Sequence, residues 1–129
     1  MGVKEEATKL HKSGFNCAQS VLGALRDYTG LDDKTALAVS AGFGGGVRCG
    51  EICGAVCGAV MAIGMAFPYN DSSDAAAKTK IGALAADCTG RFREEFGCLR
   101  CQDLKANRVS CPALIEYAAQ LAENMITEN

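Results

Sequence analysis

Residues 42–58 read GFGGGVRCGEICGAVCG, in which a flexible glycine run leads into a segment rich in small and sulfur-bearing side chains. Cys49, Cys53 and Cys57 recur every four residues, which is the spacing of one face of a helix. A neighbouring row of small residues would let another backbone approach closely. This row consists of Gly50, Gly54, Gly58, Ala62 and Ala66. The segment predicts a glycine-rich loop followed by a central helix from about residue 51 to residue 67.

The rest of the chain predicts a helical fold. Apolar residues recur at intervals of three and four, and no stretch alternates like a strand. Apart from the central helix, helices are expected at about 3–12, 17–28, 34–41 and 74–96, and from Pro112 toward the C-terminus. We therefore predict an all-α, single-domain bundle (residues 1–129) of about five to six helices around a glycine-rich loop and a central small-residue helix.

Length and charge narrow the class of protein. A chain of 129 residues is long enough for one domain with a substantial core. The net charge is -2 with the two signs interspersed, so no basic stripe indicates a nucleic-acid partner. The N-terminal segment has no apolar signal core, and the uncharged run 52–67 is short for a membrane span. We expect a cytoplasmic protein without membrane insertion.

The chain carries eight cysteines, which is more than packing alone explains. In a reducing compartment they seldom form a disulfide framework, which leaves metal or cluster ligation, redox dithiols or packing. Packing is sufficient for Cys88, which lies on an apolar helical stripe. His11, the only histidine, lies on a charged helix, where we expect it to be exposed and without a role.

Four cysteines are expected at or beside helix N-termini: Cys17, Cys53, Cys101 and Cys111. The positive end of the helix dipole and the unpaired N–H groups of the first turn stabilise a thiolate there and lower its pKa. Cys98-Leu99-Arg100-Cys101 is also a C-x-x-C motif, which occurs in zinc sites, redox dithiols and clusters.

Several segments in order carry a resemblance to a known family: FNCAQSV (15–21), AGFGGG (41–46), CGAVCGA (53–59), CQDL (101–104) and Cys111. Together they resemble the C_GCAxxG_C_C family of small prokaryotic proteins, which is described as redox-active. The resemblance places the four signature cysteines of the family on the same four residues that the helix ends select. Cys49, Cys57, Cys88 and Cys98 are additional to the pattern, and for Cys49 and Cys57 we expect supporting or packing roles.

The favoured hypothesis is a cysteine-ligated metal centre, a [2Fe–2S] cluster used in electron transfer. Its expected metal ligands are Cys17, Cys53, Cys101 and Cys111, which supply the four thiolates that such a cluster needs. Backbone N–H groups of Gly44, Gly45 and Gly46 are expected to donate to its sulfur atoms. Zinc in the same cage is the alternative metal and would be structural.

A second hypothesis is a dithiol/disulfide protein or thiol sensor. Cys53 would attack, and Cys57, Cys101 or Cys111 would resolve the mixed disulfide. Cys53 and Cys57 themselves pair poorly, because a helix fixes their side chains in a relation that rarely suits a disulfide. A third is a helical interaction module with cysteines that only pack. The small-residue row would also allow a close helix–helix homodimer. The sequence names no redox partner, and whether the protein is an enzyme stays open.

Overall fold

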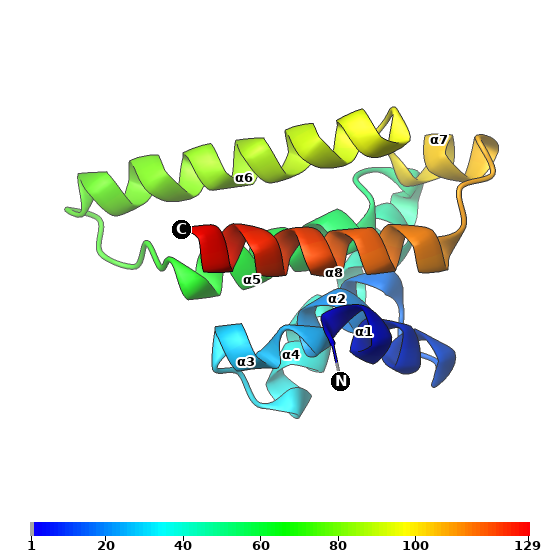
Figure 1. Cartoon of the computed structure of the whole chain (residues 1–129), viewed down its shortest axis with the longest axis horizontal. Coiled ribbons are helices and arrows are strands. Elements are labelled where there is room, and N and C mark those ends of the chain that lie inside the picture. Colours follow the sequence, from blue (N-terminus) through cyan, green and yellow to red (C-terminus); the bar gives the residue numbers. More distant parts are fainter. Residues whose placement is uncertain (1) are drawn as a thin grey trace.

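The computed structural model describes residues 2–129, and these form a helical bundle (Figure 1). Its helices, in chain order, are α1 (Val3–Lys12), α2 (Cys17–Ala24), α3 (Arg26–Thr29), α4 (Asp33–Ser40), α5 (Gly54–Ala66), α6 (Ala75–Phe96), α7 (Cys101–Ala106) and α8 (Cys111–Glu128). A 3-10 turn (Ala41–Phe43) and a wide turn (Gly46–Gly50) occupy the glycine-rich segment. The all-α class predicted from the sequence is confirmed.

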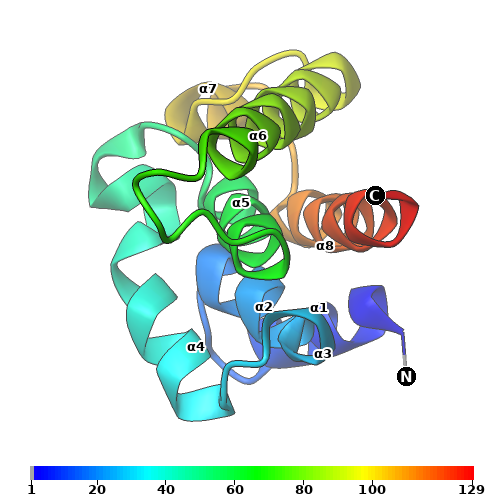
Figure 2. The ribbon, with the colours of Figure 1, turned by 90° about the vertical axis from the view of Figure 1, so that its left-hand side faces the viewer.

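Helix α5 is the centre of the bundle. It packs against α2, α6 and α8, and Figure 2 shows it with these helices around it. Most of its residues are buried, and α8 faces it with the side chains that its periodicity predicts to point inward. These are Leu114, Ile115, Ala118, Leu121, Ala122 and Met125, and all six are buried. The core therefore lies between α2, α5 and α8.

The small-residue row of α5 brings α2 into close contact. A Cβ on Gly58 would lie 2.7 Å from the carbonyl oxygen of Ala18 and 3.1 Å from Cβ of Val21. Gly54, one turn earlier, faces the first residues of α2 at a similar distance. As expected, another backbone packs closely against this row of small residues. It is the backbone of α2 in the same chain. Gly54 and Gly58 are consequently not available for the helix–helix homodimer that the sequence suggests.

The structure has eight helices in the described residues because one expected segment divides in two and α7 is added, and the central helix is also shorter than expected. The segment 17–28 breaks at Leu25, whose φ of -99° and ψ of 19° are not helical, and continues as α3. The central helix begins at Gly54 and not near residue 51, because residues 46–53 form a turn and an extended link. Cys49 therefore does not share a helical face with Cys53 and Cys57. The segment after Cys98 adds α7.

Among the described residues, no helix combines the length and apolar character that spanning a membrane requires. The only β pairing that they contain is an isolated antiparallel bridge between Ile52 and Arg100. This bridge joins the link before α5 to the link before α7, and it matters for the arrangement of the cysteines.

Candidate functional site

One cavity of about 230 Å³ is lined by the four cysteines that lie at helix N-termini. Cys17, Cys101 and Cys111 are the first residues of α2, α7 and α8, and Cys53 is the N-cap residue of α5. The beginnings of α7 and α8 lie together at the right-hand end of Figure 1. Because four helices begin at this cavity, the positive ends of their dipoles favour thiolates there.

Cys17 is held in place by a capping box at the start of α2. The side chain of Asn16 accepts a hydrogen bond from the N–H of Gln19 at 3.0 Å, and the side chain of Gln19 accepts one from the N–H of Asn16 at 3.1 Å. Both side chains also donate to carbonyls at the end of α4 and just after it, Asn16 to that of Ala41 and Gln19 to that of Leu37. The start of α2 is thereby joined to the end of α4.

Cys53 and Cys101 are brought together by the bridge between the two links. The N–H of Cys53 donates to the carbonyl of Leu99 at 2.8 Å, and the N–H of Cys101 donates to the carbonyl of Glu51 at 2.6 Å. Arg100 Nε donates to the carboxylate of Glu51 at 3.0 Å across the same pairing. These backbone hydrogen bonds thus hold two cysteines that are far apart in the sequence at the same cavity.

Three glycines lie so close to site residues that a Cβ on any of them would come within 3 Å of its neighbour. They are Gly44 against Asn16 at 2.5 Å, Gly46 against Cys101 at 2.8 Å, and Gly54 against Cys17 at 2.6 Å. Gly45 lines the cavity, and its N–H donates to the sulfur of Cys17. Of the three glycines expected to bind a cofactor, two therefore make room for the site and one contacts a thiol.

Cys17 and Cys53 line the same cavity, and each shifts the pKa of the other. The neighbouring thiol of Cys53, together with the N–H groups of Gly45 and Ala18, lowers the pKa of Cys17 from 9.0 to about 6, although burial opposes this. The pKa of Cys53 is raised, because its proton is held by Cys17 and because its side chain is buried, with 3% of its surface exposed. Of the two thiols, Cys17 is consequently the stronger acid and ionises first.

The other four cysteines do not line the cavity. Cys88 is buried in the core and burial raises its pKa to about 11, in agreement with the packing role expected for it. Cys57 lies one turn beyond Cys53 on α5, and its pKa is also raised by burial. Cys49 is exposed and Cys98 is half-buried. The C-x-x-C motif is thus divided, since only Cys101 faces the cavity. All eight cysteines are free thiols in the structure.

His11 lines the cavity, contrary to the sequence-based expectation of an exposed histidine without a role. It is half-buried, and its Nδ1 lies 3.1 Å from the carbonyl oxygen of Phe15. A carbonyl only accepts, so Nδ1 carries a proton and donates it. The Ser13-Gly14 stop, which turns the chain from α1 back toward α2, indicates in the sequence that the end of α1 lies beside Cys17.

The cavity has the donor chemistry of a metal site but not its spacing. Four thiols are suitable ligands for zinc or for an iron–sulfur cluster. Among the described residues, however, no three side chains of Cys, His, Asp or Glu lie close enough together to hold one ion. The donor set fits such a group in its chemistry, but its spacing in this structure does not form a ready-made cage.

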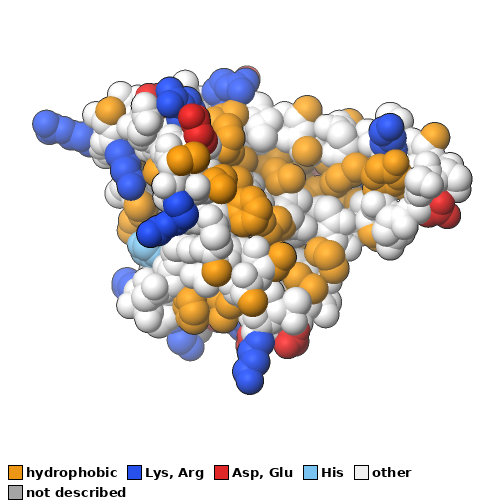
Figure 3. All heavy atoms as spheres, turned by 180° about the vertical axis from the view of Figure 1, so that it is seen from behind, with side chains coloured by type: hydrophobic (Ala, Val, Ile, Leu, Met, Phe, Trp, Pro, Cys, Tyr) orange, Lys and Arg blue, Asp and Glu red, His pale blue; other side chains and the backbone are white. Residues whose placement is uncertain are grey.

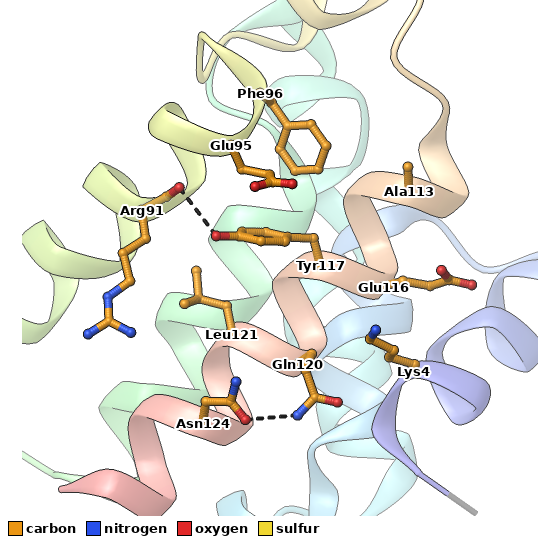
Figure 4. A pocket seen from close by; sticks show the side chains of 10 residues that line it. All are labelled: Lys4, Arg91, Glu95, Phe96, Ala113, Glu116, Tyr117, Gln120, Leu121 and Asn124. Carbon is orange, nitrogen blue, oxygen red and sulfur yellow. Dashed lines mark hydrogen bonds between the residues drawn. The ribbon is translucent and has the colours of Figure 1, made fainter.

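A second cavity, of about 530 Å³, lies between α1, α6 and α8 (Figure 4). The ring of Tyr117 extends across it and lies nearly perpendicular to the ring of Phe96, with 5.3 Å between centroids, and Tyr117 Oη donates to the carbonyl of Arg91. Glu95 and Lys4 also line it, and no cysteine does. The redox chemistry that eight thiols suggest therefore belongs to the smaller cavity.

The fold and the site define a class of protein, a helical domain in which four cysteines from separate helix starts surround one cavity. Comparison with protein families gives a consistent result. The model of the family described as "Putative redox-active protein (C_GCAxxG_C_C)" matches residues 15–125. The chain belongs to this family, and the match includes every cysteine of the chain. No curated protein and no solved structure matches the chain.

Proposed function

We propose that this is a thiol-based redox protein in which Cys17 and Cys53 cycle between dithiol and disulfide. The proposal rests on the cavity that the two thiols share and on the lowered pKa of Cys17 beside Cys53. Both residues line the cavity, but Cys17 is half-buried and can be reached by a substrate, whereas only 3% of Cys53 is exposed. The attacking role therefore goes to Cys17 and the resolving role to Cys53, the reverse of the sequence-based expectation for Cys53.

The reaction exchanges two electrons with a disulfide substrate. The thiolate of Cys17 attacks one sulfur of the substrate disulfide, forms a mixed disulfide and releases the other substrate sulfur as a thiolate. That thiolate takes the proton of Cys53. The Cys53 thiolate then attacks the sulfur of Cys17, forms the Cys17–Cys53 disulfide and releases the second substrate thiolate. The substrate disulfide is reduced, the protein dithiol is oxidised, and the reverse sequence restores the protein.

The convergence of four thiols on one cavity favours a second candidate, the iron–sulfur or other metal centre. Cys17, Cys53, Cys101 and Cys111 would hold it, and the N–H of Gly45 would donate to a sulfur ligand. A bound [2Fe–2S] cluster would supply one-electron transfer, and zinc would supply stability alone. Because no three ligands surround one point here, binding would require the four cysteines to move closer together.

Analysis of protein purified without oxygen distinguishes the two candidates. We measure iron, sulfide and zinc, the visible spectrum, and the number of free thiols before and after mild oxidation. A dithiol protein contains no stoichiometric metal, and oxidation removes two thiols that peptide mapping places at Cys17 and Cys53. Iron and sulfide with visible charge-transfer bands support the cluster. Colourless protein with stoichiometric zinc contradicts both redox proposals.

Serine variants separate the candidates a second time. Cys17→Ser abolishes both the disulfide and a four-cysteine metal site. Cys111→Ser leaves the Cys17–Cys53 disulfide intact but reduces the metal content if four cysteines are ligands. Cys49→Ser is the matched control, because Cys49 is exposed and outside the cavity. Cys17→Ser protein that still forms a disulfide at Cys53 within the cavity would remove Cys17 from the proposed pair.

A further inference from the structure

We infer that the cysteine cavity takes an anionic substrate, a small disulfide or thiol that carries carboxylates. The inference rests on the proposed thiol redox function and adds the class of substrate. The cavity is lined by Arg48, Lys105 and His11 and by no acidic side chain. The chain as a whole has a net charge of -2, so the charge at this cavity is opposite in sign to that of the molecule.

The two cations with fixed charge at the cavity are not neutralised by ion pairs. The ion pairs within residues 2–129 involve Arg26, Arg91 and Arg100, and none includes Arg48 or Lys105. Both side chains are exposed. Figure 3 shows that many of the visible Lys and Arg side chains project from its left-hand end, which is the α7 end of the molecule. These positive charges attract an anion that approaches this end before it reaches the thiols.

Arg48 reaches the cavity through a strained backbone. Gly45, Gly46, Val47 and Arg48 have φ values of 64°, 64°, 57° and 62°, so they form a left-handed turn. Non-glycine residues rarely adopt this conformation, and a β-branched residue such as Val47 is a clear exception. Core packing does not account for it, because 45% of Val47 is exposed and Arg48 is exposed. The turn does place Arg48 at the mouth of the cavity, and such strain is concentrated at functional sites.

The dimensions of the cavity favour a small molecule. Its volume of about 230 Å³ accommodates a disulfide group and a short carboxylate-bearing arm. Lys105 follows Cys101 by one turn on α7, so both lie on the same face of that helix. A carboxylate held between Arg48 and Lys105 would orient the substrate disulfide toward Cys17, and guanidinium and ammonium groups are the usual partners of carboxylates.

The test measures how fast the reduced protein exchanges with three disulfides of different charge. The probes are glutathione disulfide (anionic), 2-hydroxyethyl disulfide (neutral) and cystamine (cationic), each normalised to its rate with a free model thiol. We expect the ratio of the anionic to the cationic rate to be at least ~10 at low salt and to decrease as salt is added. The variant Arg48→Gln/Lys105→Gln loses this ratio, and Arg48→Lys retains most of it.

Arg108→Gln is the matched control. Arg108 is an exposed arginine that also has a positive φ, of 60°, but it does not line the cavity, so its removal leaves the ratio unchanged. Equal normalised rates with all three disulfides overturn the inference and leave the dithiol function standing. No reaction with any of them overturns the dithiol function itself. A preference for an acidic protein disulfide without one for glutathione disulfide overturns the small-molecule substrate.

Discussion

Cys17 has a low pKa because several weak donors act on one sulfur. The thiol of Cys53 contributes most, and backbone N–H groups at the start of α2 and at Gly45 add to it. A position at a helix N-terminus is common among residues. Cys17 is distinguished by the second thiol, that of Cys53, which α5 places beside it. The reactivity of this residue therefore depends on a contact between two helices, which one substitution can remove.

We expect Cys53→Ala to raise the pKa of Cys17 from about 6 toward the ordinary value of 9.0, because the group that lowers this pKa most is lost. The measurement is the pH midpoint of Cys17 alkylation by iodoacetamide, followed by peptide mapping. Cys57→Ala is the control, since Cys57 lies one turn further on α5 and does not donate to Cys17. The same midpoint in wild type and in both variants would show that the pair is not formed.

The same titration makes stability depend on pH. The pKa of Cys17 is lower in the folded state than its ordinary value, so its ionisation stabilises the fold. This contribution is complete above pH 9.0 and is lost as the pH falls through about 6. Cys53, whose folded pKa is raised, opposes stability once the pH passes the ordinary thiol value. The excess unfolding free energy of wild type over Cys17→Ala should accordingly increase between pH 6 and pH 9.

At the level of elements, the glycines of α5 determine how closely α2 can approach. Gly54 faces Cys17 and Gly58 faces Ala18, so the same helix face provides both the packing and the thiol contact. Gly64 lies on the same helix, but a Cβ there would have no neighbour within 4 Å. Helix propensity alone would favour alanine at all three positions, and only the contact with α2 opposes it at Gly54 and Gly58.

We predict that Gly58→Ala destabilises the protein by about 1–3 kcal/mol, because the new methyl group overlaps the backbone of Ala18. Gly64→Ala is the matched control and should be stabilising by roughly 0.5–1 kcal/mol through helix propensity. Denaturant unfolding under reducing conditions measures both. If Gly58→Ala were as stable as Gly64→Ala, α2 and α5 would not pack as closely as the structure shows.

At the level of the whole molecule, the site depends on connections that are far apart in the chain. The capping box joins α2 to α4, and the bridge at Ile52 and Arg100 joins the links before α5 and α7. Cys17 and Cys53 consequently belong to different parts of the bundle. A disulfide between them would constrain the unfolded chain over the whole intervening segment, and that constraint has a measurable free energy.

We expect the oxidised protein to be more stable than the reduced protein by about 3–4 kcal/mol, the loop-closure value for a loop of this size. Denaturant unfolding with and without a reductant measures the difference at constant pH. Cys53→Ala should show no such difference, because it cannot form the bond. An oxidised wild type that is less stable than the reduced form would mean that the disulfide distorts the fold and that the two residues are not a native redox pair.

Much of the fold was predictable because it depends on local periodicity. α1 and the buried face of α8 follow directly from apolar spacing, and Gly97 ends α6 as expected. The predictions failed where the backbone departs from regular geometry. The break at Leu25 and the left-handed turn at Val47 have no local signal, since neither residue is typical of the conformation that it adopts.

The sequence by itself determined the helical class, the family and the four cysteines at helix starts, because caps, glycines and periodicity are local properties. Only the tertiary structure decided which thiol faces which. The pairing of Cys17 with Cys53, the entry of His11 into the cavity and the position of Arg48 all depend on contacts between segments distant in the chain. The pKa of a thiol responds to donors within a few ångströms, and that spacing exists only after the helices have packed.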